Sequence, residues 1–257
     1  MPSEWPDHYR ACKTIEEISA DNSGHLGQRQ AYIRLEDLKR GVEVRLEADH
    51  ITDMRTGLAG ALGLHFLATG PLRRIGLVGT GRVARCLALA IDHLLGPLHL
   101  RVTSRSAQNR AAFVEDIGGQ LQSQITAADT LEECLQDVDA VVTAVPTPKP
   151  ILGWKALEQV PLSVVIGGDS RTRQVEPEVL ERAEVVVDQL EQAKKSGEFV
   201  YAQQAGGMQQ INFCRLDSGE IANIGDAACG RLSAGGPRLA YFTGLAALDL
   251  FAAVTVY

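Results

Sequence analysis

Short apolar runs alternate with amphipathic segments from Arg73 to Asp188. The runs are rich in Val, Ile and Leu, so they predict buried parallel strands, and the segments between them predict helical crossovers. The expected strands are Ile75–Val78, Leu98–Thr103, Ala140–Thr143, Val164–Ile166 and Val185–Val187, and the expected helices lie near Val83–Leu95, Gln108–Asp116, Leu131–Gln136 and Glu176–Arg182. This pattern predicts an α/β fold with a doubly wound parallel sheet of the Rossmann type.

The two ends of the chain follow other patterns. Apolar and polar residues alternate in Ala31–Leu35 and Val42–Leu46, which predicts half-buried antiparallel strands. Apolar helices are expected at Thr56–Thr69 and Leu245–Val256. We therefore expect the ends to form one small α+β domain for dimerisation and substrate binding, residues 1–70 and 235–257, with a dinucleotide-binding domain, residues 71–234, inserted between them.

A glycine-rich turn joins the first expected strand to the helix after it, and this context is typical of a dinucleotide-binding fingerprint. The turn contains two glycines, of which the first permits a tight bend and the second lets the backbone approach a pyrophosphate. The N–H groups of the helix start would then face the phosphates. The predicted cofactor-binding residues of this turn are Gly79, Thr80, Gly81, Arg82 and Val83.

The second expected strand ends in Ser104-Arg105-Ser106. An NAD-binding fold usually places an acidic residue there, to bind the ribose 2′-hydroxyl. Hydroxyl and guanidinium groups instead suit a 2′-phosphate dianion, so the segment predicts NADP(H) as the cofactor. The alternative is that Arg105 is a solvated loop arginine, which its place in the fold disfavours.

Composition narrows the classes of partner and site. The formal net charge of −7 disfavours nucleic acid and anionic membranes as partners, and no apolar stretch is long enough to predict a transmembrane helix. The N-terminal segment lacks the basic start and apolar run of a signal peptide, and the five cysteines are scattered, so a cytoplasmic location is expected. The six histidines show no metal-ligand spacing, so no metal site is expected.

Several further segments resemble, in order, motifs of the ornithine cyclodeaminase/μ-crystallin family, which includes amino-acid dehydrogenases and ketimine reductases. The resemblance covers nearly the whole chain and is strong because the motifs occur together. The matching segments are Lys13, Ile51-Thr52-Asp53-Met54-Arg55-Thr56-Gly57, Asp139-Ala140-Val141-Val142-Thr143-Ala144, Gly167-Gly168-Asp169 with Arg173, Val187-Asp188 with Gln192-Ala193 and Gly197-Glu198, and Gly244-Leu245-Ala246-Ala247-Leu248-Asp249.

The resemblance implies roles for these residues. Lys13 and Arg55 would face the substrate carboxylate and the reacting nitrogen, and Asp169 would be the acid/base carboxylate near the nicotinamide. The family carries a further segment ahead of the part that resembles Met1-Pro2, with an arginine for the substrate carboxylate, so Arg10 is a candidate for that role here. Further cofactor contacts are expected from Arg55, Thr56, Thr143, Ala144, Val145, Gly168, Asp169 and Arg173.

The residue chemistry is consistent with these roles but leaves alternatives. An α-imino acid needs a cation for its carboxylate and a carboxyl group near the iminium nitrogen. Asp169 could instead cap a helix, Lys13 could be solvated, and Arg55 could simply begin a helix. That last position disfavours a cation unless an anion is bound there. Asp188 and Asp249 are expected to be structural, fixing loops or helix ends.

The sequence thus predicts an NADPH-dependent oxidoreductase that acts on the C–N bond of a small imine or amino acid in an interdomain cleft, and that forms a homodimer. The alternatives are an ornithine-type cyclodeaminase, which recycles its cofactor within one turnover, and a protein that binds NADPH and a small ligand without turnover.

Overall fold

The computed structural model describes residues 2–18, 28–233 and 235–257, so Met1 lies outside the described residues. The chain divides into two compact units. Unit 1 consists of Met1–Thr56 and Gly244–Tyr257, and unit 2 consists of Gly57–Thr243. In the described part of the chain, none of the helices combines the length and the apolar character needed to cross a membrane.

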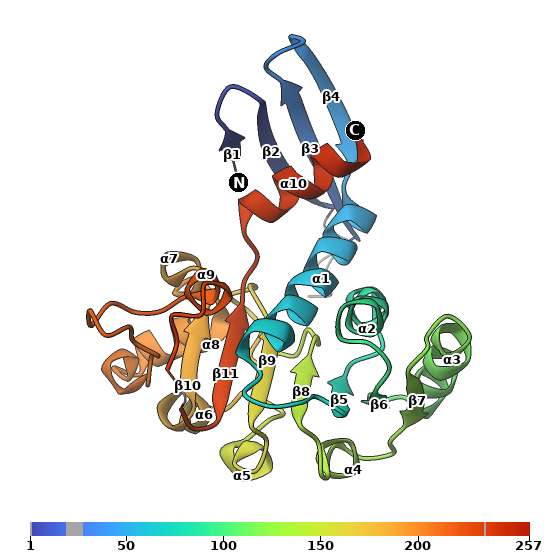
Figure 1. Ribbon diagram of the computed structural model, residues 1–257, viewed down its shortest axis with the longest axis vertical. Coiled ribbons are helices and arrows are strands. Elements are labelled where there is room, and N and C mark those ends of the chain that lie inside the picture. Colours follow the sequence, from blue (N-terminus) through green and yellow to red (C-terminus); the bar gives the residue numbers. More distant parts are fainter. Residues whose placement is uncertain (1, 19–27, 234) are drawn as a thin grey trace. The chain divides into compact units, whose positions relative to one another are not determined.

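Unit 2 is built on a seven-stranded parallel sheet with the order β10-β11-β9-β8-β5-β6-β7 (Figure 1). Its strands are β5 (Arg74–Val78), β6 (His99–Thr103), β7 (Gln124–Ala127), β8 (Ala140–Thr143), β9 (Leu162–Ile166), β10 (Glu184–Val187) and β11 (Arg238–Phe242). The chain runs from β5 outward to β7 and then returns to the other side of β5, so the strand order reverses between β5 and β8. Ligands of such sheets bind at this reversal, beyond the carboxyl ends of the strands.

Helices connect the strands of unit 2. They are α2 (Arg82–Leu95), α3 (Ala107–Gly118), α4 (Leu131–Leu135), α5 (Trp154–Leu157), α6 (Pro177–Arg182), α7 (Leu190–Ala193), α8 (Gly197–Gln204) and α9 (Ile224–Ala228), with a 3₁₀ turn at Met208–Gln210. Helix α1 (Asp49–Leu67) enters unit 2 with its second half.

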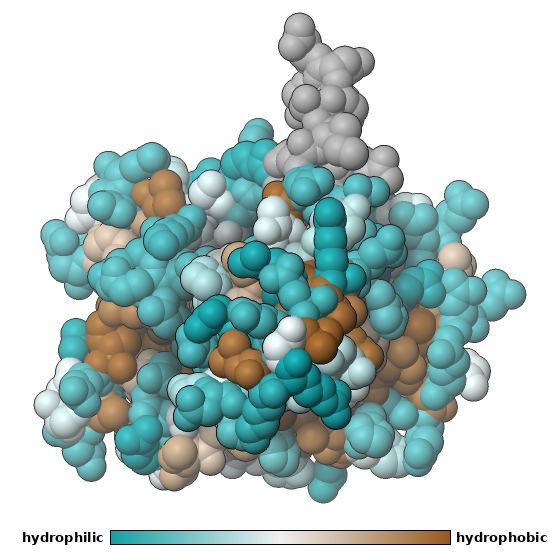
Figure 2. All heavy atoms as spheres, turned by 90° about the horizontal axis from the view of Figure 1, so that it is seen from above, coloured by the Kyte–Doolittle hydropathy of each residue, from teal (hydrophilic) through white to brown (hydrophobic). Residues whose placement is uncertain are grey.

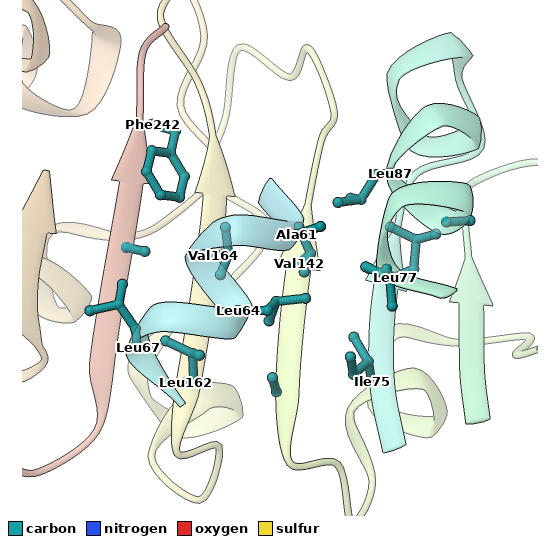
Figure 3. Close-up of a cluster of buried hydrophobic side chains, with 14 of the residues drawn as sticks. Ala61, Leu64, Leu67, Ile75, Leu77, Leu87, Val142, Leu162, Val164 and Phe242 are labelled. Atoms are coloured by element: carbon teal, nitrogen blue, oxygen red, sulfur yellow. The ribbon is translucent and has the colours of Figure 1, made fainter. Parts of the chain in front are cut away.

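The core of unit 2 has two layers because strand side chains alternate between the sheet faces. Leu77, Val142 and Val164 point to one face of the sheet, where they share a cluster with Leu64 and Leu67 of α1 and Leu87 of α2 (Figure 3). Their neighbours along the strands, such as Val78 and Val165, belong to the cluster on the other face. All these strand residues are buried, which explains the continuous apolar runs of the sequence.

Unit 1 contains a four-stranded antiparallel sheet with the order β1-β2-β3-β4, and its helix α10 (Ala246–Val256) packs against it. The strands are β1 (Pro2–Trp5), β2 (Tyr9–Ile18), β3 (Gln28–Asp37) and β4 (Val42–Glu47). The small core joins Ile33 and Leu35 of β3 to Leu250 and Ala253 of α10. The face of β2 that carries Ala11 and Lys13 is therefore turned toward buried side chains.

The Rossmann-type sheet and the separate antiparallel sheet confirm the expected fold class. Four strands were not expected from the sequence: β1, β2, β7 and β11. The boundaries expected from the sequence lie at residues 70/71 and 234/235, whereas the two compact units meet at residues 56/57 and 243/244. Residues 238–242 form a fully buried strand between β9 and β10, and Leu64 and Leu67 are buried in the core of unit 2, so both segments belong to the larger unit.

Candidate functional site

The turn after β5 has the geometry that a pyrophosphate requires. Gly79 has φ +122°, and a Cβ at this position would lie 3.0 Å from the Ala144 carbonyl oxygen, so the backbone passes close to the loop after β8. A Cβ at Gly81 would meet nothing within 4 Å, which leaves open space beside the chain. Gly81 precedes α2 and no side chain caps that helix, so its first N–H groups suit a phosphate.

A cavity of about 760 Å³ lies over the carboxyl ends of β5, β6 and β8, a size within the range of small-molecule and cofactor sites. It is lined by Val78, Gly79, Thr80, Thr103, Ser104, Arg105, Ser106, Asn109, Arg110, Asp129, Leu131, Val145, Pro146, Thr147, Pro148 and Ile151. Six predicted cofactor residues thus share one cavity: Gly79, Thr80, Ser104, Arg105, Ser106 and Val145. The lining combines backbone turns, hydroxyl groups and arginines, which are groups that can bind phosphate.

The loop after β6 is held by an arginine that the sequence analysis did not single out. The Ser106 hydroxyl caps α3 by accepting the Asn109 N–H at 3.2 Å. One turn into α3, Arg110 is buried and donates from Nη1 to the Ser104 carbonyl oxygen at 2.6 Å. Its Nη2 donates to the Asp129 carboxylate at 2.8 Å. Arg110 therefore connects the ends of β6 and β7 at the cavity wall.

The loops after β8 and β9 are joined by the buried side chain of Gln174. Its Oε1 accepts hydrogen bonds from the Thr143 hydroxyl at 2.8 Å and from the Val145 N–H at 3.1 Å, and its Nε2 donates to the Ile166 carbonyl oxygen at 2.7 Å. Thr143 is buried and its hydroxyl is used in this network, so it supports the cavity loop from within.

A buried acid holds the backbone of Gln174 in turn. Glu198 Oε1 accepts the Gln174 N–H at 2.6 Å, and Glu198 Oε2 accepts the Tyr241 hydroxyl. Burial raises the pKa of the Glu198 carboxyl and, together with the nearby Glu198 charge, raises that of the Tyr241 hydroxyl. This network lies in the core below the loops of β8 and β9.

Asp169 follows β9 and the glycine pair, beyond the carboxyl end of the strand, as the sequence predicts. Gly168 has φ +119°, and a Cβ there would come within 2.9 Å of the Thr243 carbonyl oxygen. The Asp169 carboxylate accepts Arg171 Nε at 3.0 Å and Arg171 Nη2 at 2.9 Å, as well as the Arg171 N–H. The alternative role as a helix cap is wrong, because the next helix begins only at Pro177.

Arg173 lies in the same loop, and its backbone contacts the cavity-lining residue Thr147, but Arg173 itself does not line the cavity. Its backbone N–H donates to the Thr147 carbonyl oxygen at 2.7 Å, and its guanidinium lies 4.1 Å from the centre of the Tyr201 ring. Its cofactor contact remains a prediction. Asp188 is structural, as expected: its carboxylate accepts the backbone N–H and the hydroxyl of Thr243 at 2.8 and 2.9 Å.

Unit 1 brings together two of the predicted substrate residues. Lys13 Nζ lies 3.1 Å and Arg55 Nε lies 3.0 Å from the same oxygen, Asp249 Oδ1. The side chains of Lys13 and Asp249 are almost completely buried, and that of Arg55 is 11% exposed. Helix α1 begins at Asp49, so Arg55 lies inside it and does not begin it, and the alternative of a solvated Lys13 is also wrong.

The group of Lys13, Arg55 and Asp249 carries two positive charges and one negative charge. Burial and the neighbouring Arg55 guanidinium lower the pKa of Lys13, whereas Asp249 opposes this shift. Asp249 Oδ2 is buried without a hydrogen-bond partner among the described residues. An ammonium and a guanidinium on the same carboxylate oxygen place two cationic donors side by side, which is a combination that can bind a carboxylate.

The remaining predicted residues lie elsewhere in unit 1. Arg10 is exposed and pairs with Glu4 at 3.4 Å and Glu36 at 3.3 Å. Because side chains alternate along β2, Arg10 and Lys13 point to opposite faces of the sheet, and the structure does not bring them together. Thr56 is half-buried next to Arg55 in α1. The cofactor contacts expected of Arg55 and Thr56 remain predictions.

Three side chains that hold these sites were not assigned that role from the sequence: Arg110 and Gln174 were not singled out, and Asp249 was expected only to fix a loop or a helix end. The signal for Asp249 was present, since a single acid in the apolar helix expected at the C-terminus needs a buried partner. The apolar pattern gave no comparable signal for Arg110 or Gln174, because their partners are backbone and side-chain atoms of distant segments.

Comparisons with known proteins agree with this architecture. The model of the ornithine cyclodeaminase/mu-crystallin family matches residues 1–257. An alanine dehydrogenase of Archaeoglobus fulgidus is 29% identical over 219 residues, which are 82% of this chain and 64% of that protein. The chain thus spans less than two thirds of the length of this relative.

Two solved structures share the fold. An archaeal alanine dehydrogenase dimer with bound NAD has a TM-score of 0.83 at 24% identity, covering 100% of this chain and 79% of that one. The Δ(1)-pyrroline-2-carboxylate reductase of Thermococcus litoralis, in complex with NADH and L-proline, has a TM-score of 0.80 at 21% identity, covering 96% and 77%. With its whole length matched by the family model, the chain belongs to the ornithine cyclodeaminase/mu-crystallin family.

Proposed function

We propose that this chain is an NADPH-dependent oxidoreductase that acts on the C–N bond of a small imine or amino acid. The observation that carries the proposal is the buried group of Lys13 and Arg55 around one Asp249 oxygen, in a chain whose other unit has a dinucleotide-type cavity. The neighbouring ammonium and guanidinium groups supply the donors that the carboxylate of an imino or amino acid requires. The names of the relatives support this substrate class, since they include an alanine dehydrogenase and a pyrroline-2-carboxylate reductase.

In this proposal the residues have separate tasks. Arg55 and Lys13 bind the substrate carboxylate, and Asp249 keeps the two cations in place. Asp169 stabilises positive charge on the iminium nitrogen, and the Arg171 guanidinium, which donates to both oxygens of its carboxylate, fixes the position of that carboxylate. When bound, the reduced nicotinamide supplies a hydride. The turn of Gly79 and Gly81 and the backbone N–H groups at the start of α2 would hold its pyrophosphate.

NADP(H) is proposed over NAD(H) because the cavity wall carries Ser104, Arg105, Ser106 and Arg110 where a ribose-binding acid would otherwise stand. Losing a charge-assisted phosphate contact typically costs about 1.5–3 kcal/mol, or roughly ten- to a hundredfold in affinity. Titration of the protein with both reduced cofactors, followed by nicotinamide fluorescence, tests this preference. Equal affinity for NADH and NADPH would contradict it.

We also propose a homodimer. Unit 1 has a small core and exposes large apolar side chains, among them Trp5, Ile15, Met54 and Phe251. Figure 2 shows several apolar patches within a largely hydrophilic surface. One solved relative is described as a dimer. Sedimentation at micromolar concentration tests the proposal, and a single species of 27.7 kDa would contradict it.

The activity is tested by following nicotinamide absorbance with three groups of compounds: cyclic imino acids, α-keto acids with ammonia, and ornithine or lysine. Net oxidation of NADPH by an imine, or by a keto acid with ammonia, supports the proposed reductase or dehydrogenase. Formation of a cyclic amino acid from ornithine or lysine without net oxidation would instead identify a cyclodeaminase. Binding of cofactor without any product would identify a binding protein.

A further inference from the structure

The cavity wall at the ends of β6 and β7 carries three charged side chains: Arg105, Arg110 and Asp129. Arg110 is the buried member, whereas the Asp129 side chain is 88% exposed. Two positive charges and one negative charge leave this wall with an excess of one positive charge. Without Arg110, the charges of Arg105 and Asp129 would cancel.

Both acceptors of Arg110 belong to residues of the cavity wall. Nη1 binds the Ser104 carbonyl oxygen at 2.6 Å, and Nη2 binds the Asp129 carboxylate at 2.8 Å. Each acceptor carries negative charge that would repel an anion beside it. The Thr103 hydroxyl donates to the Ala128 carbonyl oxygen at 3.0 Å, so the segment before Asp129 is itself fixed to the end of β6. The position of Asp129 beside the Ser104–Ser106 loop is therefore built into the sheet.

We propose that Arg110 determines specificity for a nucleotide with a 2′-phosphate, by compensating Asp129 and the Ser104 carbonyl oxygen while Arg105 provides the exposed cation. The inference rests on the proposed preference for NADP(H) and extends it to a residue outside the Ser104–Ser106 loop. A ligand with a neutral 2′-hydroxyl does not depend on this charge balance. Arg110 therefore raises the affinity for nucleotides with a 2′-phosphate over those without one, in addition to holding the loop.

The test uses calorimetry with adenosine 2′,5′-bisphosphate and AMP, which differ by the 2′-phosphate alone. In Arg110→Met, the affinity for the bisphosphate should fall about tenfold or more, while the affinity for AMP should change by less than about threefold. In Asp129→Asn, bisphosphate affinity should rise. The double variant Arg110→Met/Asp129→Asn restores the excess charge and should recover most of the lost bisphosphate affinity.

Arg85→Met is the matched control, because Arg85 also pairs with an acid, Asp116 at 2.9 Å, but does not line the cavity. It should leave both affinities unchanged. Equal losses for both ligands in Arg110→Met, no loss for either, or a double variant no better than Arg110→Met would overturn the inference. Equal affinity of the unmodified protein for both ligands would instead contradict the proposed NADP(H) preference. The role of Arg110 is tested separately, by dividing the affinity of each variant by that of the unmodified protein for the same ligand.

Discussion

The Thr143 hydroxyl donates a hydrogen bond to Gln174 Oε1 at 2.8 Å, which ties the end of β8 to the loop that follows β9. The same oxygen accepts the Val145 N–H, and the amide nitrogen of Gln174 reaches the Ile166 carbonyl oxygen. One buried side chain thus holds the cavity loop and the segment that leads to Asp169. The Arg173 N–H, which donates to the Thr147 carbonyl oxygen, joins the same two loops through the backbone.

Gln174→Ala should destabilise unit 2 by about 1–3 kcal/mol, because it leaves buried polar groups without their partners. NADPH affinity should fall as well, since Val145 lines the cavity. Urea unfolding and cofactor titration measure the two effects. Gln120→Ala is the matched control, because Gln120 is exposed and its side-chain amide donates to the Asp116 carbonyl oxygen of the same helix end. Comparable stability of the two variants would show that the Gln174 connection contributes little.

The contribution of Glu198 to stability should depend on pH. Burial raises the pKa of its carboxyl in the folded protein, so the folded state binds this proton more tightly than the unfolded chain does. The contribution of Glu198 to stability is therefore fully present below its unfolded pKa and is lost as the pH rises through the raised folded pKa. Relative to Glu198→Gln, the unmodified protein should lose melting temperature as the pH increases over this range. A constant difference in melting temperature between the two proteins would contradict the assignment.

Asp249 is predicted to be the most costly member of the buried group in unit 1. In Asp249→Asn, two buried cations lose their shared anion, and removing one partner from a buried ion pair typically costs about 3–5 kcal/mol. Lys13→Met should cost less, because it leaves the pair of Arg55 and Asp249 intact. Urea unfolding measures both, with Asp217→Asn in an exposed turn as the control. A larger loss of unfolding free energy in Lys13→Met than in Asp249→Asn would contradict this prediction.

Asp169 should affect the rate more than cofactor binding. Removing a carboxylate that acts on the reacting group typically lowers the rate about a hundred- to ten-thousandfold. NADPH affinity should change little in Asp169→Asn, because the predicted phosphate contacts are at the turn after β5. Steady-state kinetics with an accepted imine and cofactor titration separate the two effects. If the Asp169→Asn variant reduces the imine as fast as the unmodified protein does, Asp169 has no role in the chemical step.

The hydrophobic pattern predicted the sheet of unit 2 well, because a buried parallel strand such as β5 or β8 requires a continuous apolar run. It failed for β11, although Leu239, Ala240 and Tyr241 are buried, because the segment before this strand lacks the helical periodicity that marks a crossover. The cofactor turn was also predictable, since Gly79 and Gly81 act through local backbone geometry. By contrast, the partners of Lys13 and Arg55 depend on α10, which is distant in sequence, and no local pattern records that contact.

In the proposed reaction, hydride passes from NADPH to the carbon of a substrate C–N bond. Cyclic imino acids should be incubated with NADPH deuterated at the transferred position, and the amino-acid product should be analysed by mass spectrometry. The product should gain one deuterium at the former imine carbon for each NADPH oxidised. Product without deuterium at that carbon, or oxidation of NADPH without a matching amino acid, would contradict it.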